Sequence, residues 1–272
     1  MLPEGLAGSG RPFLQGYDRE MESTSTAGKR VAFFGGSFDP PHEGHLAVAR
    51  AARATLALDS VLFAPVGAQP LKPQGSTAGF EDRLAMTRLA IADEPGFAVS
   101  LADAPRPSAA PNYTLDTLLH LRIELAPGGI LFCLMGADSF LGLRRWHRSA
   151  EIPFVAPLIV ASRPGQPLDG LRDALPLGLT MEAASGVVPG APVRPDPAVE
   201  VRTFILRNGA GENSPFFLLP GLDIEISASR IRGLIRGGAR EAVVAAPESP
   251  DAGRRLVPIA VLNYIRAHRL YR

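Results

Sequence analysis

Apolar residues along this chain occur in two alternating patterns. Short continuous apolar runs occupy residues 31–34, 60–64, 97–101, 130–135 and 157–161. Between them, apolar residues recur with helical spacing at 45–56, 80–93 and 114–124. Strands of a parallel sheet that is covered on both faces are apolar throughout rather than alternating, and amphipathic helices connect them. The pattern therefore predicts an α/β fold with a doubly wound parallel sheet.

The second half of the chain loses this rhythm. Proline and glycine are dense over residues 164–221, where we expect no clear elements before a short apolar run at 216–219. So long a stretch without elements is uncommon in a compact domain, and it indicates an insertion or an irregular segment over 166–221. A helix is predicted at 229–235, and an amphipathic helix at 258–268 closes the chain.

Composition and charge narrow the class of protein. Residues 1–29 lack hydrophobic periodicity and are predicted to be a flexible extension, whereas 30–272 are predicted to form one domain. Lys and Arg number 28 against 27 Asp and Glu, which argues against a protein that coats nucleic acid or membranes. The chain shows neither a signal-peptide pattern nor an apolar stretch of about 18 residues, so we expect a cytoplasmic protein without membrane or nucleic-acid partners. Cys133 is the only cysteine and is expected to be buried and structural.

Candidate chemistry concentrates in the segment FGGSFDPPHEGHL at residues 34–46. It lies between a predicted strand and a predicted helix. Glycines there let the backbone approach a ligand, and a helix start offers free N–H groups to an anion. His42 and His45 lie three residues apart at that helix start, where imidazoles can donate hydrogen bonds to phosphate oxygens as charge develops. The segment therefore predicts phosphate chemistry.

Other interpretations of the same segment fit less well. A zinc-protease helix carries its histidines four apart in His-Glu-x-x-His, whereas His42 and His45 are three apart with a glycine between them. The dinucleotide-binding pattern G-x-G-x-x-G and the P-loop pattern do not occur in the sequence. Two solvent-facing histidines beside a turn are the plain alternative.

The segment GGSFDPPHEGHL resembles the signature of the nucleotidylyltransferase superfamily, whose short core is (H/T)-x-G-H. Further segments, in the order that the family has them, make the chain similar to the bacterial nicotinate-nucleotide adenylyltransferases. These segments lie at 83–93, 112–118, 136–140 with Trp146, 161–165, 226–232 and 261–271. The resemblance covers residues 31–165 and 222–272.

The resemblance implies a Rossmann-like nucleotidylyltransferase fold and transfer of the adenylyl group of ATP to nicotinate mononucleotide in NAD biosynthesis. The expected reaction is a direct in-line attack without a covalent intermediate, yielding nicotinate adenine dinucleotide and pyrophosphate. Mg²⁺ is the expected cofactor, held by ATP and water because the sequence suggests no carboxylate cluster. An adenylyltransferase for nicotinamide mononucleotide or phosphopantetheine and a non-catalytic nucleotide-binding regulator stay open as alternatives, as does a homo-oligomer.

The resemblance also assigns roles to individual residues. It implies that His42, His45 and Arg232 are catalytic. It implies ATP-binding roles for Gly35, Gly36, Ser37, Phe38, Lys72, Asp138, Arg163, Ser227 and Ser229. It implies that nicotinate mononucleotide is bound by Tyr113, Thr114 and Trp146.

Some of these residues also have a physical interpretation of their own. Ser229 is predicted to cap its helix, and Thr114 is predicted to cap a helix whose start would receive the nicotinate carboxylate. Trp146, the only tryptophan, either stacks on a pyridine ring or packs in the core. Lys72 either lies near the phosphates or is a solvated loop lysine. Asn112 replaces a serine that is common in the family, a change that we expect to be harmless beside a cap.

Overall fold

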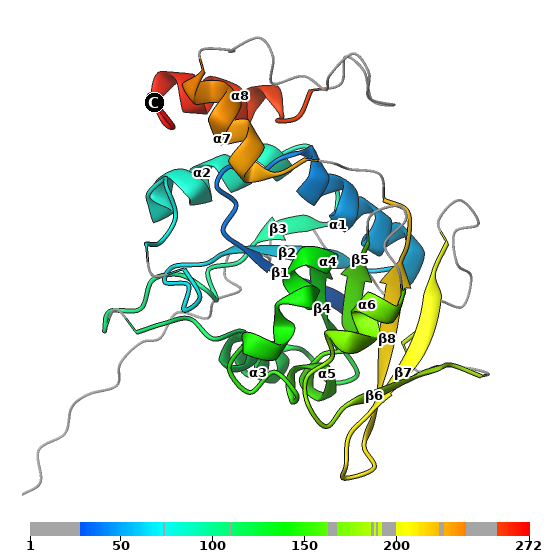
Figure 1. Cartoon of the computed structure of the whole chain (residues 1–272). Helices are drawn as coiled ribbons and strands as arrows, with labels where there is room; N and C mark the ends of the chain where they lie inside the picture. Colours follow the sequence, from blue (N-terminus) through cyan, green and yellow to red (C-terminus); the bar gives the residue numbers. More distant parts are fainter. Residues whose placement is uncertain are drawn as a thin grey trace, which may run out of the picture.

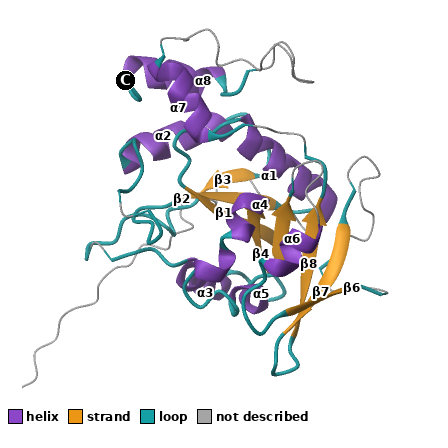
Figure 2. Cartoon of the chain, in the orientation of Figure 1, coloured by secondary structure: helices purple, strands orange, loops and turns teal. Residues whose placement is uncertain are grey.

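The computed structural model describes residues 28–272 except 73, 109, 163–167, 186–187, 189, 192–199, 223–225 and 238–254. Most of the predicted extension and Arg163 therefore lie outside the described residues. In the part of the chain that is described, an eight-stranded sheet is covered by helices on both faces (Figure 1, Figure 2). This arrangement confirms the predicted doubly wound α/β fold.

The elements agree with the predicted positions to within a few residues over 30–161 and near the end of the chain. The strands are β1 (Arg30–Gly36), β2 (Ser60–Pro65), β3 (Phe97–Val99), β4 (Ile130–Gly136), β5 (Leu158–Ala161), β6 (Thr180–Ala183), β7 (Arg202–Arg207) and β8 (Asn213–Leu219). The helices are α1 (Glu43–Leu56), α2 (Phe80–Ile91), α3 (Thr114–Glu124), α4 (Ala137–Leu141), η1 (Leu143–Arg145, a 3-10 turn), α5 (Ile152–Val155), α6 (Leu168–Asp173), α7 (Ala228–Arg236) and α8 (Ile259–Ala267).

The strand order in the sheet is β3-β2-β1-β4-β5-β8-β7-β6. β1 pairs in parallel with both β2 and β4, so the chain leaves the centre of the sheet in one direction after β1 and in the other after β4. Open α/β sheets bind ligands in the crevice at the carboxyl ends of the strands where the order reverses. The fold thus places the glycines that end β1 and β4, Gly36 and Gly136, beside the expected crevice.

The sheet beyond β5 differs from the prediction. The segment 164–221 contains α6 and the strands β6, β7 and β8, and β7 pairs antiparallel with both of its neighbours. The strand β7 alternates, with Phe204 and Leu206 buried between exposed arginines, as expected where one face of an antiparallel strand contacts the core. This alternation is a weak signal in the sequence because proline and glycine dominate the flanking residues.

Two hydrophobic layers hold the helices on the two faces of the sheet (Figure 1). α1, α2, α7 and α8 pack on one face with Phe132 and Leu134 of β4, whereas α3, α4 and α5 pack on the other with residues such as Leu131 and Met135. Cys133 is 2% exposed, and burial raises the pKa of its thiol to about 12, which agrees with the predicted structural role. No helix in the described residues is long and apolar enough to cross a membrane.

Candidate active site

A cavity of about 770 Å³ opens at the carboxyl ends of β1, β4 and β5 and is also lined by α1 and α7. Every site residue expected from the sequence, apart from Arg163, lines this cavity. These residues are Gly35, Gly36, Ser37, Phe38, His42, His45, Lys72, Tyr113, Thr114, Asp138, Trp146, Ser227, Ser229 and Arg232. The fold therefore gathers into one place motifs that are scattered along the sequence.

The turn between β1 and α1 forms one wall of the cavity. Phe38 has a positive φ of 46°, which bends the chain, and its ring is only 2% exposed. That ring packs edge-on against Phe34 with the centroids 5.7 Å apart, and its centroid lies 5.5 Å from that of Phe63. Phe38 thus anchors the turn in the core, while the first turn of α1 lies beside the cavity through Gly44 and His45.

The two histidines of the turn are stacked, with ring centroids 3.7 Å apart and an angle of 25° between the rings. The backbone N–H of His42 donates to Nδ1 of His45 at 3.2 Å. Burial lowers the pKa of His42 to about 4, and burial and the adjacent His42 hold the pKa of His45 well below its usual range. Both rings are therefore neutral near pH 7. Because Nδ1 of His45 accepts a hydrogen bond and the ring is neutral, its Nε2 carries the ring hydrogen and acts as a donor.

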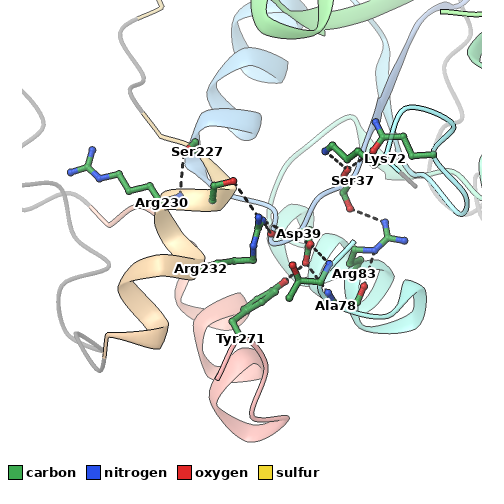
Figure 3. Close-up of polar contacts among 12 residues, drawn as sticks. Ser37, Asp39, Lys72, Ala78, Arg83, Ser227, Arg230, Arg232 and Tyr271 are labelled. Carbon is green, nitrogen blue, oxygen red and sulfur yellow. Dashed lines mark hydrogen bonds and ion pairs between the residues drawn. The ribbon is translucent and has the colours of Figure 1, made fainter. Parts of the chain in front are cut away.

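Asp39 organises the turn, a role that the sequence analysis did not assign to it. Its carboxylate accepts from the backbone N–H groups of Thr77 and Ala78 at 2.6 and 3.1 Å and from the hydroxyl of Tyr271 at 2.7 Å. Its backbone carbonyl accepts from Nη1 of Arg232 at 2.7 Å (Figure 3). Asp39 therefore joins the turn to three segments that are distant in sequence.

Arg83 of α2 is a second residue that holds the turn through hydrogen bonds. It is 2% exposed, and its guanidinium donates to the backbone carbonyls of Ser37, Val66 and Ala78 at 2.8, 2.8 and 3.3 Å (Figure 3). A planar guanidinium suits this role because its donors diverge at fixed angles. Arg83 lies in one of the segments that carry the family resemblance, but sequence alone did not indicate its contacts.

Lys72 reaches the turn from the loop that follows β2. Its Nζ donates to Oγ of Ser37 at 3.2 Å, and that hydroxyl donates to Oε1 of Gln69 at 3.2 Å. Lys72 is exposed, yet it lines the cavity with Ser37 and Gln69. Of the two alternatives open for this lysine, the structure favours a place beside the turn.

Known proteins resemble this chain over most of its length. The model of the cytidylyltransferase-like family matches residues 33–234. A probable nicotinate-nucleotide adenylyltransferase of Geobacter sp. strain M21 is 34% identical over 242 residues, which cover 89% of this chain and 98% of that protein. The chain belongs to the nicotinate-nucleotide adenylyltransferase family. A relative with the same name from Laribacter hongkongensis is 38% identical over 243 residues, which cover 89% of this chain and 94% of that protein.

Solved structures agree on the fold of this family member. The Plasmodium falciparum nicotinic acid mononucleotide adenylyltransferase complexed with NaAD matches with a TM-score of 0.55 at 16% identity, covering 89% of this chain and 97% of that chain. The same enzyme complexed with APC matches with a TM-score of 0.54 at 15% identity. The match confirms the predicted Rossmann-like nucleotidylyltransferase fold.

A second part of the cavity in this family member is aromatic. The ring centroids of Tyr113 and His147 lie 4.4 Å apart, and both residues line the cavity together with Trp146. Trp146 also packs partly against the layer that holds α3 and α4, so it contacts the core while one part of it lines the cavity. The helix start beside them differs from the prediction: Tyr113 is the N-cap of α3, and Thr114 is the first helical residue.

The cap of α7 also differs from the prediction. Ser227, with extended backbone angles, is the N-cap, and its hydroxyl accepts from the backbone N–H of Arg230 at 3.2 Å. Ser229 lies inside the first turn, where its hydroxyl accepts from Nη2 of Arg232 at 3.2 Å. The predicted cap was two residues late because either serine suits that position by residue type alone.

Asn112 links the two parts of the cavity. Its side-chain oxygen accepts from the backbone N–H of Ala68 at 2.9 Å, and its own N–H donates to the carbonyl of Ala68 at 2.9 Å. Its side-chain amide donates to the carbonyl of Ala104 at 3.0 Å. Asn112, which directly precedes Tyr113, thus ties the loop that carries Lys72 to the start of α3.

Asp103 lines the cavity close to β1 and was not predicted as a site residue. It is 4% exposed and accepts a hydrogen bond from the hydroxyl of Thr117. Burial raises the pKa of its carboxyl to about 6, although the Thr117 hydroxyl opposes this shift. Because the folded pKa lies above the unfolded value of about 4, the contribution of this group to stability is full below pH 4 and is lost as the pH rises through 6.

We therefore expect Asp103→Asn to remove one component of the pH dependence of stability. Between pH 4 and pH 7, the free energy of unfolding of the wild type should fall by about 2–3 kcal/mol relative to the variant. Asparagine can still accept from Thr117, so the fold is retained. Urea denaturation at both pH values measures the difference, and equal pH dependence in the two proteins would contradict the assignment.

Proposed function

We propose that this protein transfers the adenylyl group of ATP to nicotinate mononucleotide, forming nicotinate adenine dinucleotide and pyrophosphate for NAD biosynthesis. One observation carries the proposal: a single cavity joins a wall suited to polyphosphate with a wall suited to a pyridine ring. Family membership supports it, since relatives at 34% and 38% identity are named for this activity. The structurally similar P. falciparum enzyme was solved with NaAD and with APC.

The reaction is one displacement at the α-phosphorus of ATP. A phosphate oxygen of nicotinate mononucleotide forms the new P–O bond. The bond to the oxygen that bridges the α- and β-phosphorus breaks, and pyrophosphate leaves with that electron pair. The step uses no protein nucleophile, so the protein acts by positioning the two phosphates and stabilising charge. We assign this task to Nε2–H of His45, the guanidinium of Arg232, His42 and the backbone N–H of Gly44, which lines the cavity at the start of α1.

The remaining ATP contacts are assigned to the wall around the turn. The triphosphate would lie against the glycine turn and the start of α7, and the carboxylate of Asp138, in the first turn of α4, suits a hydroxyl of a nucleotide. The residues proposed to bind ATP are Gly35, Gly36, Ser37, Phe38, Lys72, Asp138, Ser227 and Ser229. Arg163 keeps the same assignment on the sequence alone.

Mg²⁺ enters with ATP in this proposal. Within the described part of the chain, no group of three or more histidine, cysteine, aspartate or glutamate side chains could hold a metal. The carboxylate of Asp39 is already engaged by two backbone N–H groups and the hydroxyl of Tyr271. These features fit an ion that is held by phosphate oxygens and water, as Mg²⁺ prefers, and that neutralises phosphate charge.

The pyridine ring is assigned to Tyr113 and Trp146, and its carboxylate to the start of α3 at Thr114. We expect Trp146→Ala to weaken the binding of nicotinate mononucleotide about tenfold, because stacking on an aromatic side chain is lost. Thr114→Ala should change it less than about twofold, since the backbone N–H at the helix start remains. Titration calorimetry measures both, with Trp146→Phe as the control that restores a ring. A larger effect of Thr114→Ala would overturn the assignment.

The function itself is tested by the choice of acceptor. Purified protein with ATP and Mg²⁺ should release pyrophosphate faster with nicotinate mononucleotide than with nicotinamide mononucleotide, and not at all with phosphopantetheine. Faster turnover of nicotinamide mononucleotide would favour that alternative substrate. Nucleotide binding without pyrophosphate release from any acceptor would favour a non-catalytic regulator. The homo-oligomer is a proposal separate from the reaction. Light scattering of the full chain would test it by measuring its mass in solution.

A further inference from the structure

The last residues of the chain contact the turn between β1 and α1. After α8 the backbone turns, and Tyr271 adopts a positive φ of 61°, an unfavourable conformation for a bulky residue. Its side chain is 5% exposed and its hydroxyl donates to Oδ1 of Asp39 at 2.7 Å (Figure 3). We propose that Tyr271 is a positioning residue for the catalytic site, which holds the carboxylate of Asp39 so that Arg232 stays free to bind phosphate.

Asp39 is placed to compete with phosphate for Arg232. The guanidinium already donates to the backbone carbonyl of Asp39 at 2.7 Å, and its Nη1 lies 3.9 Å from the carboxylate oxygen Oδ2. That separation is too long for a hydrogen bond. A small rotation of the carboxylate would make a charge-assisted bond to the guanidinium, which is the kind of bond that a phosphate must also make. Whatever fixes the carboxylate therefore decides how available Arg232 is.

Three donors fix the carboxylate in its present orientation. The backbone N–H groups of Thr77 and Ala78 hold it from the loop before α2, and the hydroxyl of Tyr271 holds it from the end of the chain. Only the last of these donors is a side chain and can be removed by substitution. Burial raises the pKa of Tyr271 and the bond to Asp39 adds to this, so the phenol stays protonated and keeps donating at physiological pH.

The same region of the chain offers a matched control. Tyr264 in α8 donates its hydroxyl to Oδ1 of Asp82 at 3.0 Å, a bond between the same two residue types. Asp82 lies in the first turn of α2, and neither Tyr264 nor Asp82 lines the cavity. Tyr264→Phe and Tyr271→Phe each delete one hydroxyl that anchors the C-terminal region, but only Tyr271→Phe removes a donor to the Asp39 carboxylate.

The inference rests on the proposed function because Arg232 is taken to bind ATP phosphates. We expect Tyr271→Phe to lower kcat/KM for ATP about tenfold, as when one bond to a carboxylate is lost. Tyr264→Phe should stay within about twofold of the wild type. In an Arg232→Ala background, adding Tyr271→Phe should have almost no further effect, because Tyr271 acts through Arg232. Thermal midpoints of both variants set an assay temperature at which each is folded.

Equal kcat/KM for the two phenylalanine variants, or an undiminished effect of Tyr271→Phe in the Arg232→Ala background, would overturn the inference. A wild-type chain that does not turn over nicotinate mononucleotide would instead contradict the proposed function. In that case the affinity for α,β-methylene-ATP replaces kcat/KM as the measured quantity. About tenfold weaker binding by Tyr271→Phe alone then supports the inference, and equal binding by both variants refutes it.

Discussion

Replacing His45 by alanine is expected to lower kcat at least about hundredfold with a smaller change in KM, as for the loss of a donor that acts in the transition state. The structure gives the reason. Nδ1 of His45 is occupied as an acceptor from the backbone of His42, so the neutral ring carries its hydrogen on Nε2. The site is buried, where a fixed donor stabilises developing charge more than it would in water.

Two further variants separate the two nitrogens of His45. The amide nitrogen of His45→Gln can replace Nε2 as a donor, so this variant should retain part of the activity that His45→Ala loses. The amide oxygen of His45→Asn can replace Nδ1, which keeps the bond to His42 but supplies no donor to the substrate. We expect His45→Asn to be as impaired as alanine in steady-state turnover of ATP with nicotinate mononucleotide. Near-normal kcat for His45→Ala would remove this residue from the mechanism.

Replacing Arg232 by alanine is expected to lower kcat/KM for ATP by about a hundredfold to a thousandfold. The side chain is 20% exposed, lines the cavity and is oriented by Asp39 and Ser229. Its Nε is buried and has no hydrogen-bond partner among the described residues. Such a guanidinium is held in place with capacity left for an anion.

Matched variants decide whether charge or geometry matters at this position. Arg232→Lys keeps the positive charge but loses the planar fork, so it should recover only part of the loss. Arg236 is an exposed arginine in the last turn of the same helix and does not line the cavity. Arg236→Ala should therefore leave kcat/KM unchanged. Equal effects of Arg232→Ala and Arg236→Ala would show that α7 contributes only general positive charge.

Most of the fold was predictable where each element carries its own signal. The apolar runs that became β1, β2 and β4 are buried on both faces and needed no knowledge of their partners. β7 was missed because alternation over only six residues, Arg202–Arg207, is a weak signal beside dense proline and glycine. The two helix caps were misplaced by one or two residues since a cap depends on local backbone angles as well as on residue type.

The residues that line the cavity were predictable as a set, but the hydrogen-bond network that holds them was not. Ser37, His42 and His45 share one segment, and the carboxyl ends of parallel strands meet at one edge, so their proximity to Asp138 followed from the predicted fold. The roles of Asp39 and Arg83 did not follow. Their partners are backbone groups and side chains far along the chain, and neither residue type indicates which partner it will meet.

By itself, the sequence determined the secondary structure around the cavity, the family and the chemical groups available for adenylyl transfer. These depend on residues close together in the chain or on motifs of fixed spacing. Only the tertiary structure decided how those groups are held. It brings Tyr271 to Asp39 across 232 residues of sequence, and it leaves His45 neutral by burying it. The physical reason is that hydrogen-bond partners and desolvation are properties of the packed chain, which no local pattern of residues records.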